Sequence, residues 1–522
     1  MRNHKFNTYN FNENKSFVGL IPKLNKSLGK FTTGKVDEPV VSVYDPTANG
    51  VDSMEVVSTT LLAKNATQPE PPTPPIPDPD EPVVQPEVIE NTPEQNEIEE
   101  DVVNQLETAT KTTTINIENG VVNNLTITEN VNVSSTVSGN FQNGATIITN
   151  SSKSLTIDNK TEEPINISLI SNNGATIYLR GNYKDIYLNG KSIGAASSIY
   201  GNVSGIIAID DNVTSDVSLT VNFVGEESGV KYLGSNNLTI SDGNAEVMGS
   251  PTVYAPHATV TMGGKYKDVT ATVSKDTLIL KSGFHAKTLN VINGSVLFYG
   301  VDIKDFADTI INKNIEYKPY KLEITTENFS KLTSNPGIYN IVEDINTNKN
   351  ITFGIVANGK YVYNLNNHEV KCGTKSSGSL FLRGSVNVTI NGEGKLINNT
   401  ESYGVWSSGK NVIVNINGGD FEAYTHVLYA ENGVINVYGG TFKMLGNPEL
   451  DIKGHCKFML NCLDANYKSG DAKIIVYGGK YYNFNPSESY SEPGAPISFV
   501  ANGYHVVESV EDGVPVFMVV KD

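Results

Sequence analysis

Paired carboxylates are the first residues of this sequence that suggest chemistry. Asp420 and Glu422 are two positions apart in "GGDFEAY", and Glu431 and Asp464 follow in the same third of the chain. Inverting glycosidases hold two carboxyl groups roughly 6.5–9.5 Å apart, a spacing that residues two apart on a strand or on adjacent coils of a repeat can meet. Carboxylates are also ordinary on the solvated faces of repeat proteins. We therefore expect that the chain is not an enzyme.

A second group, His455, Cys456 and Cys462 in "GHCKFMLNC", has the residue types of a zinc site. Structural zinc takes four ligands, often as two closely spaced pairs, and no second pair is present. Small side chains facing inward from a strand explain this stretch better, so we expect no metal and no cofactor. The third cysteine is Cys372, and three cysteines give no disulfide framework.

Tyrosines are the third group, because flat rings exposed along a rod can stack on sugar rings. Strand alternation must turn about half of the aromatic residues inward. Trp406 and Tyr477 belong to the same region of the sequence. The residues that we expect to contact a glycan are Tyr424, Tyr429, Tyr438, Tyr481 and Tyr482.

The composition indicates strands and excludes two classes of partner. Of 522 residues, 46 are Gly and only 18 % are charged, a profile typical of short strands joined by tight turns. The net charge of −18 argues against nucleic acid, because phosphate binding needs clustered Lys and Arg. No segment has the apolar run of a signal peptide or the ~20 apolar residues of a membrane span. We expect no nucleic acid and no membrane among the partners.

The N-terminal segment 1–64 begins with a basic stretch on an acidic chain. Such asymmetry is typical of a docking segment, although a solvated, disordered terminus would have the same composition. Residues 65–100 form an acidic, proline-rich linker, since Gln68 to Glu100 holds ten of the 23 prolines. This composition predicts a stiff spacer, with a Pro-rich recognition ligand as the alternative. The basic residues that we expect to dock are Arg2, Lys5, Lys15, Lys23, Lys26 and Lys30.

A short helix is predicted over residues 93–111, where Ile98, Val102 and Leu106 recur on one face. Two turns of apolar residues are marginal for an isolated helix. The helix is either a neck through which chains associate or a cap over the first coil of the region that follows.

From about residue 112 the chain repeats short alternating runs bounded by Asn, Gly, Ser or Asp. "NVIVNINGGDFEAY" and "NGVINVYGGTFKML" align on the glycine pairs Gly418-Gly419 and Gly439-Gly440, and this interval defines one period. The interval from Gly181 to Gly264 is close to four such periods, and Gly139 lies two periods before Gly181. We interpret the interval from Gly439 to Gly478 as nearly two coils.

A period of about 20 residues with strand and turn units predicts a solenoid. The expected fold is all-β: a right-handed parallel β-helix in two segments, 101–318 with the helical neck and 319–522. Residues 112–315 should make about ten coils of two or three strands. In the second segment we expect Val412, Val414, Ile416, Ile435 and Val437 to point inward. Stacked side-chain amides of Asn415, Asn417 and Asn436 are expected to form a ladder.

Both ends of the second segment carry closing signals. Thr325 or Thr326 can cap a short helix that buries Phe329 and Leu332, before Pro336-Gly337 turns into a strand. The last strands flank Glu511-Asp512-Gly513 and predict a hairpin that covers the final open edge.

The turns "INGGDF", "VYGGTF" and "VYGGKY" and the closing "NPSESYSEPGAPISFVANGYHVV" resemble pectate-lyase-like β-helices of phage fibres. They are similar to fibre and head-decoration proteins of crAss-like phages of gut Bacteroidetes. The likeness covers about 320–522, extends to 112–318 in repeat style only, and carries over no catalytic residue. It implies a structural protein of the virion surface, made in the host cytoplasm. It also implies docking to capsid or other virion proteins through the N-terminus, a homo-oligomer, expected to be a trimer, and contact with host surface glycans.

Two other functions remain open on the sequence. One is a tailspike-type polysaccharide depolymerase, which also uses a β-helix and paired carboxylates. The other is a bacterial surface adhesin, which would need an export signal and an anchor, and neither is visible in the sequence.

Overall fold

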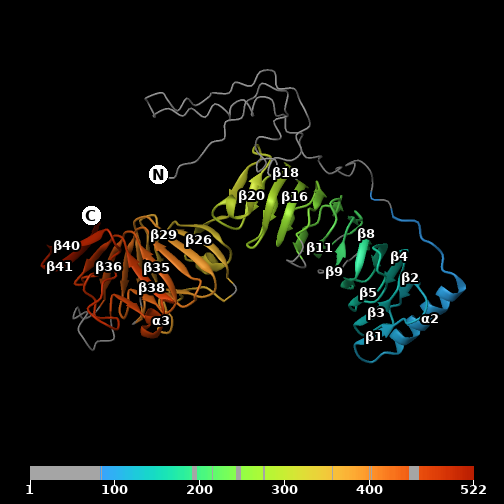
Figure 1. Ribbon diagram of the computed structural model, residues 1–522, viewed down its shortest axis with the longest axis horizontal. Helices are drawn as coiled ribbons and strands as arrows, with labels where there is room; N and C mark the ends of the chain where they lie inside the picture. Colours follow the sequence, from blue (N-terminus) through green and yellow to red (C-terminus); the bar gives the residue numbers. More distant parts are fainter. Residues whose placement is uncertain are drawn as a thin grey trace, which may run out of the picture. The chain divides into compact units, whose positions relative to one another are not determined.

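The structure is a computed structural model that describes residues 83–522 apart from 84, 191–196, 214, 243–247, 274–276, 356, 399, 401 and 446–457. The predicted anchor, residues 1–64, and most of the linker lie outside the described residues, as do all six basic docking residues. In the described part, nearly all regular structure is β, arranged as parallel β-solenoids (Figure 1). The predicted fold class is confirmed.

The first solenoid has two stacks of parallel strands, and each coil gives one strand to each stack. One stack contains β1 (Thr113–Asn116), β3 (Ser135–Gly139), β5 (Leu155–Asn159), β7 (Ile177–Arg180), β9 (Ser197–Val203), β11 (Val217–Phe223), β13 (Leu238–Asp242), β15 (Val260–Met262), β17 (Leu278–Leu280), β19 (Val296–Phe298) and β21 (Tyr317–Pro319). The other contains β2 (Val122–Ile127), β4 (Phe141–Thr149), β6 (Ile165–Ser171), β8 (Asn182–Asn189), β10 (Ile206–Ile209), β12 (Gly229–Tyr232), β14 (Thr252–Ala255), β16 (Lys265–Val273), β18 (His285–Asn293) and β20 (Ala307–Ile310). A 3₁₀ turn, η2 (Ile303–Asp305), precedes β20.

Register shows how long each coil is. Ile206 pairs with Gly229, whereas Val260 pairs with Leu278, so coil length varies moderately along the solenoid. Among the described residues, β1 to β20 make ten coils, as the sequence predicted. Gly181 and Gly264 follow β7 and β15, four coils apart, which confirms that spacing as well.

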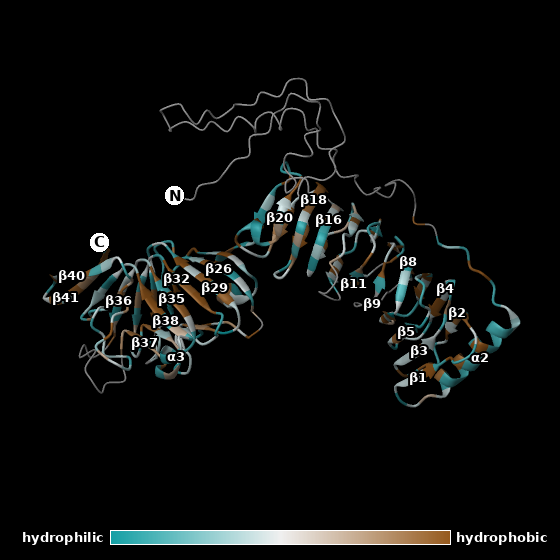
Figure 2. Cartoon of the chain, viewed as in Figure 1, coloured by the Kyte–Doolittle hydropathy of each residue, from teal (hydrophilic) through white to brown (hydrophobic). Residues whose placement is uncertain are grey.

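The core of the first solenoid comes from the period of two along each strand. In β5, Leu155 and Ile157 are buried, while Thr156 and Asp158 are partly exposed. Buried and partly exposed residues alternate in the same way along β7, β13 and β15, and Figure 2 shows apolar and polar residues side by side on many strands. Gly181 makes the turn into β8 at φ +108°, and a Cβ there would lie 2.4 Å from Asn159 O. Only glycine combines that conformation with so close an approach.

The second solenoid has three sheets. One contains β22 (Lys321–Ile324), β23 (Gly337–Ile341), β26 (Gly359–Asn364), β29 (Val386–Asn391), β32 (Ile413–Ile416), β35 (Gly433–Val437) and β38 (Ala472–Val476). The next contains β24 (Ile345–Asn346), β27 (Glu369–Cys372), β30 (Lys395–Asn398), β33 (Asp420–Ala423), β36 (Thr441–Met444), β39 (Lys480–Tyr482), β41 (Val514–Lys521) and β40 (Tyr504–Glu511). The third contains β25 (Ile351–Thr352), β28 (Leu380–Leu382), β31 (Val405–Ser407), β34 (Leu428–Ala430) and β37 (Leu460–Cys462), followed by helix α3 (Asp464–Ser469).

Coil length in the second solenoid differs from the prediction at one place. Val414 pairs with Ile435 one regular period later, but the next partner of Ile435 is Ile474, almost twice as far along the chain. The interval from Gly439 to Gly478 is therefore one enlarged coil, and the interpretation as nearly two coils is wrong. The extra residues lie between β36 and β38, where the chain adds α3 and residues 446–457.

The inward residues that the sequence predicted are confirmed. Val412, Val414, Ile416, Ile435 and Val437 are all at most 1 % exposed and belong to the core of the second solenoid. That core and the core of the first solenoid are separate hydrophobic clusters.

The predicted amide ladder is present for Asn415 and Asn436, whereas Asn417 belongs to a second ladder. Asn436 Nδ2 donates to Asn415 Oδ1 at 3.0 Å, and Asn415 Nδ2 donates to Asn387 Oδ1 at 3.1 Å. The second ladder joins one asparagine from each of four successive coils, namely Asn417, Asn391, Asn364 and Asn340.

Helix α2 (Pro93–Thr108) closes the first solenoid. Val102 and Leu106 are buried in the first core, and the helix packs on β2 and β1. Thr92 and Gln95 form a reciprocal capping box at its start. Of the two alternatives for this helix, a neck through which chains associate and a cap over the first coil, the structure shows the cap.

The C-terminal hairpin closes the second solenoid. β40 and β41 are antiparallel, and Asp512 and Gly513 make the turn with positive φ. β41 pairs with β39, so the hairpin covers the last open edge of that sheet, as predicted. The predicted short helix is the 3₁₀ turn η3 (Phe329–Thr333), which buries Phe329 and Leu332. Its N-cap is Asn328 and not Thr325 or Thr326, and the Asn328 side chain makes no capping hydrogen bond to η3 but accepts the Thr325 N–H.

Candidate functional site

The candidate carboxylates divide between two sheets. Asp420 and Glu422 both point outward from β33, on one face as expected. Glu431 and Asp464 follow β34 and β37, which pair in neighbouring coils. Glu431 accepts hydrogen bonds from Trp406 Nε1 at 3.1 Å and from Ser408 Oγ at 2.7 Å. Its carboxylate thus fixes the indole ring.

Asp420 also lines a shallow depression of about 370 Å³ beside β27 and β30. Asp344 Oδ1 in this depression accepts the Glu369 N–H at 2.9 Å and lies 3.3 Å from His368 Nδ1. The backbone hydrogen bond and the histidine lower the pKa of Asp344. The remaining charged or polar residues that line the depression are Glu393, Lys395 and Asn367.

Of the cysteine and histidine group, only Cys462 lies among the described residues. Cys462 is buried at the end of β37, and burial raises the pKa of its thiol. His455 and Cys456 lie outside the described residues. Where the structure describes the chain, no group of three His, Cys, Asp or Glu side chains is arranged to hold a metal ion.

A buried carboxyl group lies next to Cys462. Glu492 is 3 % exposed, and its Oε1 accepts the Cys462 N–H at 2.6 Å and the Ser491 hydroxyl at 3.2 Å. Its Oε2 is buried and has no hydrogen-bond partner among the described residues. Burial raises the pKa of Glu492 to about 7, because desolvation outweighs the two hydrogen bonds.

Tyr481 is one of the five predicted glycan contacts, and that prediction is wrong. Its ring is fully buried between Phe442, at a ring-centre distance of 4.9 Å, and Phe484. Its hydroxyl donates to Gly478 O. The side chain continues an aromatic column from Phe421 and Phe442 inside the solenoid, so no ligand can reach it.

Tyr424, Tyr429 and Tyr482 are partly exposed, and two of them are engaged by neighbours. Tyr429 lies on the outer face of β34, in register with Trp406, and stacks on Tyr403 at 5.3 Å. Tyr482 donates to Glu511 at 2.7 Å, and the Lys443 ammonium lies 4.3 Å from its ring centre. The face of the Tyr482 ring is therefore occupied by a cation.

Tyr438 belongs to a column of tyrosines at the ends of successive strands. It is 50 % exposed and stacks on Tyr477, one coil later, with ring centres 4.9 Å apart and planes 9° apart. Tyr504 meets Tyr477 edge-on at 5.6 Å. Val500 bridges Val476 one rung further on, which puts Ala501 in register with Tyr477, and Tyr504 follows Ala501 after the turn Asn502-Gly503.

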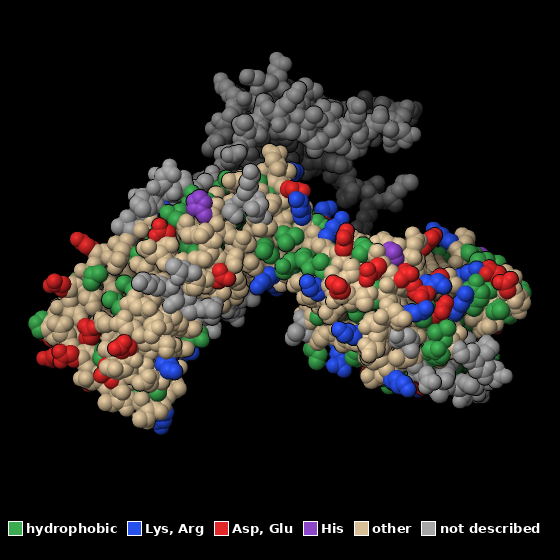
Figure 3. All heavy atoms as spheres, turned by 180° about the vertical axis from the view of Figure 1, so that it is seen from behind, with side chains coloured by type: hydrophobic (Ala, Val, Ile, Leu, Met, Phe, Trp, Pro, Cys, Tyr) green, Lys and Arg blue, Asp and Glu red, His purple; other side chains and the backbone are tan. Residues whose placement is uncertain are grey.

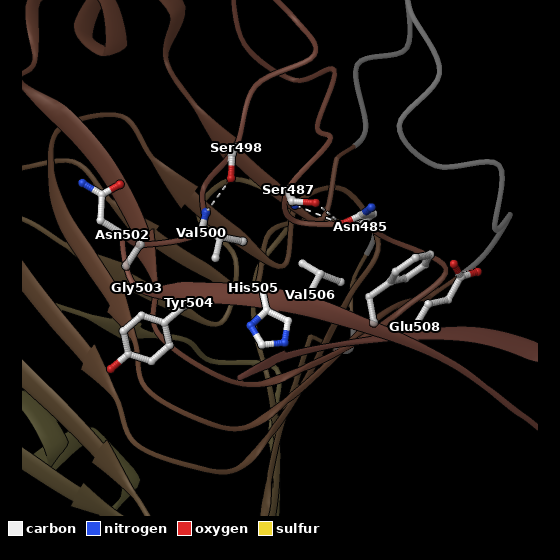
Figure 4. Close-up of a pocket in the computed structure, with 12 residues that line it drawn as sticks. Asn485, Ser487, Ser498, Val500, Asn502, Gly503, Tyr504, His505, Val506 and Glu508 are labelled. Atoms are coloured by element: carbon white, nitrogen blue, oxygen red, sulfur yellow. Dashed lines mark hydrogen bonds between the residues drawn. The ribbon is translucent and has the colours of Figure 1, made fainter. Parts of the chain in front are cut away.

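A polar depression of about 500 Å³ adjoins this column (Figure 4). Tyr504 and His505 line the depression from β40, and Asn485, Ser487 and Ser498 line it from the loop that precedes this strand. Val500, Val506 and Phe517 supply apolar surface. Asn502 and Gly503 form the turn that leads into β40, and Glu508 lies further along that strand.

Sequence reasoning identified Tyr438 but missed Tyr504 and the depression. The missed signal is the turn Asn502-Gly503, since Asn-Gly before an alternating run indicates the start of a strand. A tyrosine at that start extends the column of Tyr438 and Tyr477.

Charge is distributed rather than concentrated. Figure 3 shows Asp, Glu, Lys and Arg side chains interspersed over the visible face of the second solenoid, and mainly neutral polar surface on the first. Neither helix in the described part of the chain has the length and apolar character that crossing a bilayer requires. Comparisons with protein-family models, with curated proteins and with solved structures found no match to this chain.

Proposed function

We propose that this protein is a structural fibre or decoration protein of a phage particle. Its N-terminal segment would dock on the capsid or another virion protein, and its two β-solenoids would project from the surface. The proposal combines the resemblance of the glycine-pair turns to phage fibre β-helices with the architecture described above.

The observation that carries the proposal is the stacking of coils within each solenoid, with the first coil of the first solenoid and the last coil of the second both covered. α2 buries its apolar face on the first coil, and the hairpin of β40 and β41 pairs with β39. Free edges of parallel solenoids invite further strands, so covered ends keep such a chain at a fixed length. Fixed length and rung-by-rung support suit a projecting element. Trimer formation remains a prediction.

Virion membership is tested by mass spectrometry of purified particles and by co-sedimentation. The full-length chain should co-purify with particles, and a variant lacking residues 1–64 should stay in the supernatant as a folded protein. If the truncated chain still joins particles, the anchor assignment is wrong. If the full-length chain is absent from particles, the proposed function is wrong.

A polysaccharide depolymerase is the second candidate function, and the depression that Asp420 shares with Asp344, Glu369 and Glu393 is the observation that favours it. Incubation of the purified protein with host capsule tests it directly. Release of new reducing ends or unsaturated products, abolished by Asp420→Asn, would favour the enzyme over the structural fibre.

A further inference from the structure

We propose that the tyrosine column and the adjoining depression are two parts of one binding site for a surface glycan, each of which contacts a neutral pyranose unit. The site comprises Tyr438, Tyr477 and Tyr504 together with Asn485, Asn502 and His505. This inference rests on the proposed function for its biological setting, but the site itself is argued from the described residues.

The aromatic part of the site offers an open ring face. Tyr477 covers one face of Tyr438, while the residue one coil earlier is Asn417, a much shorter side chain. The Tyr438 ring extends beyond Asn417 and stays half exposed. An exposed ring of this kind binds the apolar face of a ligand by dispersion and burial of area. The C–H face of a pyranose ring has that character.

The polar part of the site offers groups that both donate and accept. Amides of Asn485 and Asn502 and hydroxyls of Ser487 and Ser498 line the depression. Ser487 Oγ donates to Asn485 Oδ1 at 2.8 Å, and Ser498 Oγ accepts the Val500 N–H at 3.1 Å, so both side chains have defined orientations (Figure 4). Sugar hydroxyls also donate and accept at once, which amide and hydroxyl groups match.

Charge decides between neutral and acidic sugars. None of the residues that line the depression is Lys or Arg, and Glu508 is its acidic residue. His505 Nδ1 lies 2.8 Å from Asp522 Oδ1, so a second carboxylate is at its margin. Lys521 pairs with Tyr504 across the hairpin, so an acidic sugar would meet two carboxylates against this one cation, a disfavoured balance. The site is therefore selective for neutral sugars.

Binding of full-length protein to a glycan array, followed by calorimetry with the best neutral and acidic oligosaccharides, tests the inference. Neutral pyranosides should bind, and Tyr438→Ala and Tyr504→Ala should each weaken binding at least about tenfold. Tyr438→Phe, which keeps the ring, should bind nearly as the natural chain does. Tyr482→Ala is the matched control, because Lys443 already occupies its ring, and it should leave binding unchanged.

Glu508→Gln separates the charge argument from the stacking argument. This variant should improve binding of acidic oligosaccharides while binding of neutral ones stays within about twofold. Preferential binding of acidic glycans by the natural chain would overturn the selectivity. Binding that survives both Tyr438→Ala and Tyr504→Ala, or no binding to any glycan, would overturn the site.

The two experiments distinguish failure of the glycan site from failure of the proposed function. If the chain is found in particles but binds no glycan, the site is wrong and the structural role stands. If it binds neutral glycans yet is absent from particles, the site stands and the virion assignment is wrong.

Discussion

Asparagine side chains act as structural elements in the second solenoid. Each ladder amide donates to the residue one coil before it, so the hydrogen bonds run parallel to those of the backbone. The ladder could be predicted because Asn415 and Asn436 occupy the same position in two aligned repeats. Asn387 could not be assigned in this way, since its coil is longer than the coil that joins Asn415 to Asn436.

The position within a ladder should determine the cost of losing an asparagine. Asn415 makes two amide bonds and Asn436 makes one, because Ile475 follows Asn436 in the sheet. At about 1 kcal/mol for each bond, Asn415→Ala should reduce the free energy of unfolding about twice as much as Asn436→Ala. Chemical denaturation measures both.

The double variant provides the check. Its cost should fall short of the sum of the single costs by about one bond, since the two variants remove one bond in common. Strict additivity would show that the bond between Asn436 and Asn415 contributes nothing.

Glu492 should make stability depend on pH. Its pKa is about 7 in the folded chain against a usual 4.5, so the folded chain binds more protons between these values. Stability must then fall as pH rises from about 4.5 to 7, by on the order of 3 kcal/mol, and remain lower above pH 7. Glu492→Gln should remove this fall, as seen in thermal midpoints from about pH 4.5 to 8.

The exposed Glu488 supplies the control for Glu492. Glu488→Gln should keep the pH dependence of the natural chain. Equal pH slopes for Glu492→Gln and the natural chain would show that the buried carboxyl is not responsible.

The burial of Tyr481 could have been predicted from its position in the repeat. The turns "INGGDF", "VYGGTF" and "VYGGKY" align Phe421, Phe442 and Tyr481 at one position. These three rings stack inside the core, with ring centres 5.3 and 4.9 Å apart. Alignment of the repeats thus assigns Tyr481 inward, whereas the prediction placed it among the exposed rings that contact a glycan.

Among the elements, α2 stabilises the first solenoid because it covers the open end of the core. Ile98 and Val103 also pack against this core, next to the buried Val102 and Leu106. The sequence predicted the helix and its apolar face but could not choose between a neck and a cap. That choice depends on whether the end of the first coil is otherwise uncovered. The spacing of apolar residues in the helix gives no information on this.

Leu106→Asp should open the first solenoid from its capped end. A buried carboxylate there has no partner and costs several kcal/mol. Since neighbouring rungs support one another, amide hydrogen exchange should rise in α2, β1 and β2 and stay unchanged in β32 and β35, which belong to the other core.

Asn104→Asp is the matched control for the helix, because Asn104 is exposed on the same helix and gains the same charge. It should leave exchange near that of the natural chain. A uniform rise over both solenoids in Leu106→Asp would contradict the local support between rungs.

Coil number could be predicted from the sequence where coil length is regular, but not where one coil is enlarged. About ten coils could be predicted in the first solenoid because its coil length varies only moderately, although the sequence left open whether each coil has two or three strands. The enlarged coil between β35 and β38 could not, because spacing between glycine pairs counts residues and not rungs. An insertion that leaves the sheet and returns one rung later has the same length as two regular coils.

At the scale of the whole molecule, the proposed role requires that the two capped β-solenoids lie outside the particle. Each solenoid buries its own apolar core, so the described part of the chain needs no partner to complete either core. The architecture could be predicted from repeats and turns. The setting could not, because anchoring depends on residues 1–64, whose composition fits a docking segment and a solvated terminus equally.

Electron cryo-microscopy of purified particles tests the proposed role most directly. We predict density outside the capsid or tail into which the solenoids fit as stacked parallel rungs, about 4.8 Å apart. The same density should be missing from particles made with the chain lacking residues 1–64. Particles that lack the protein, or that hold it inside the capsid, would contradict the proposed role.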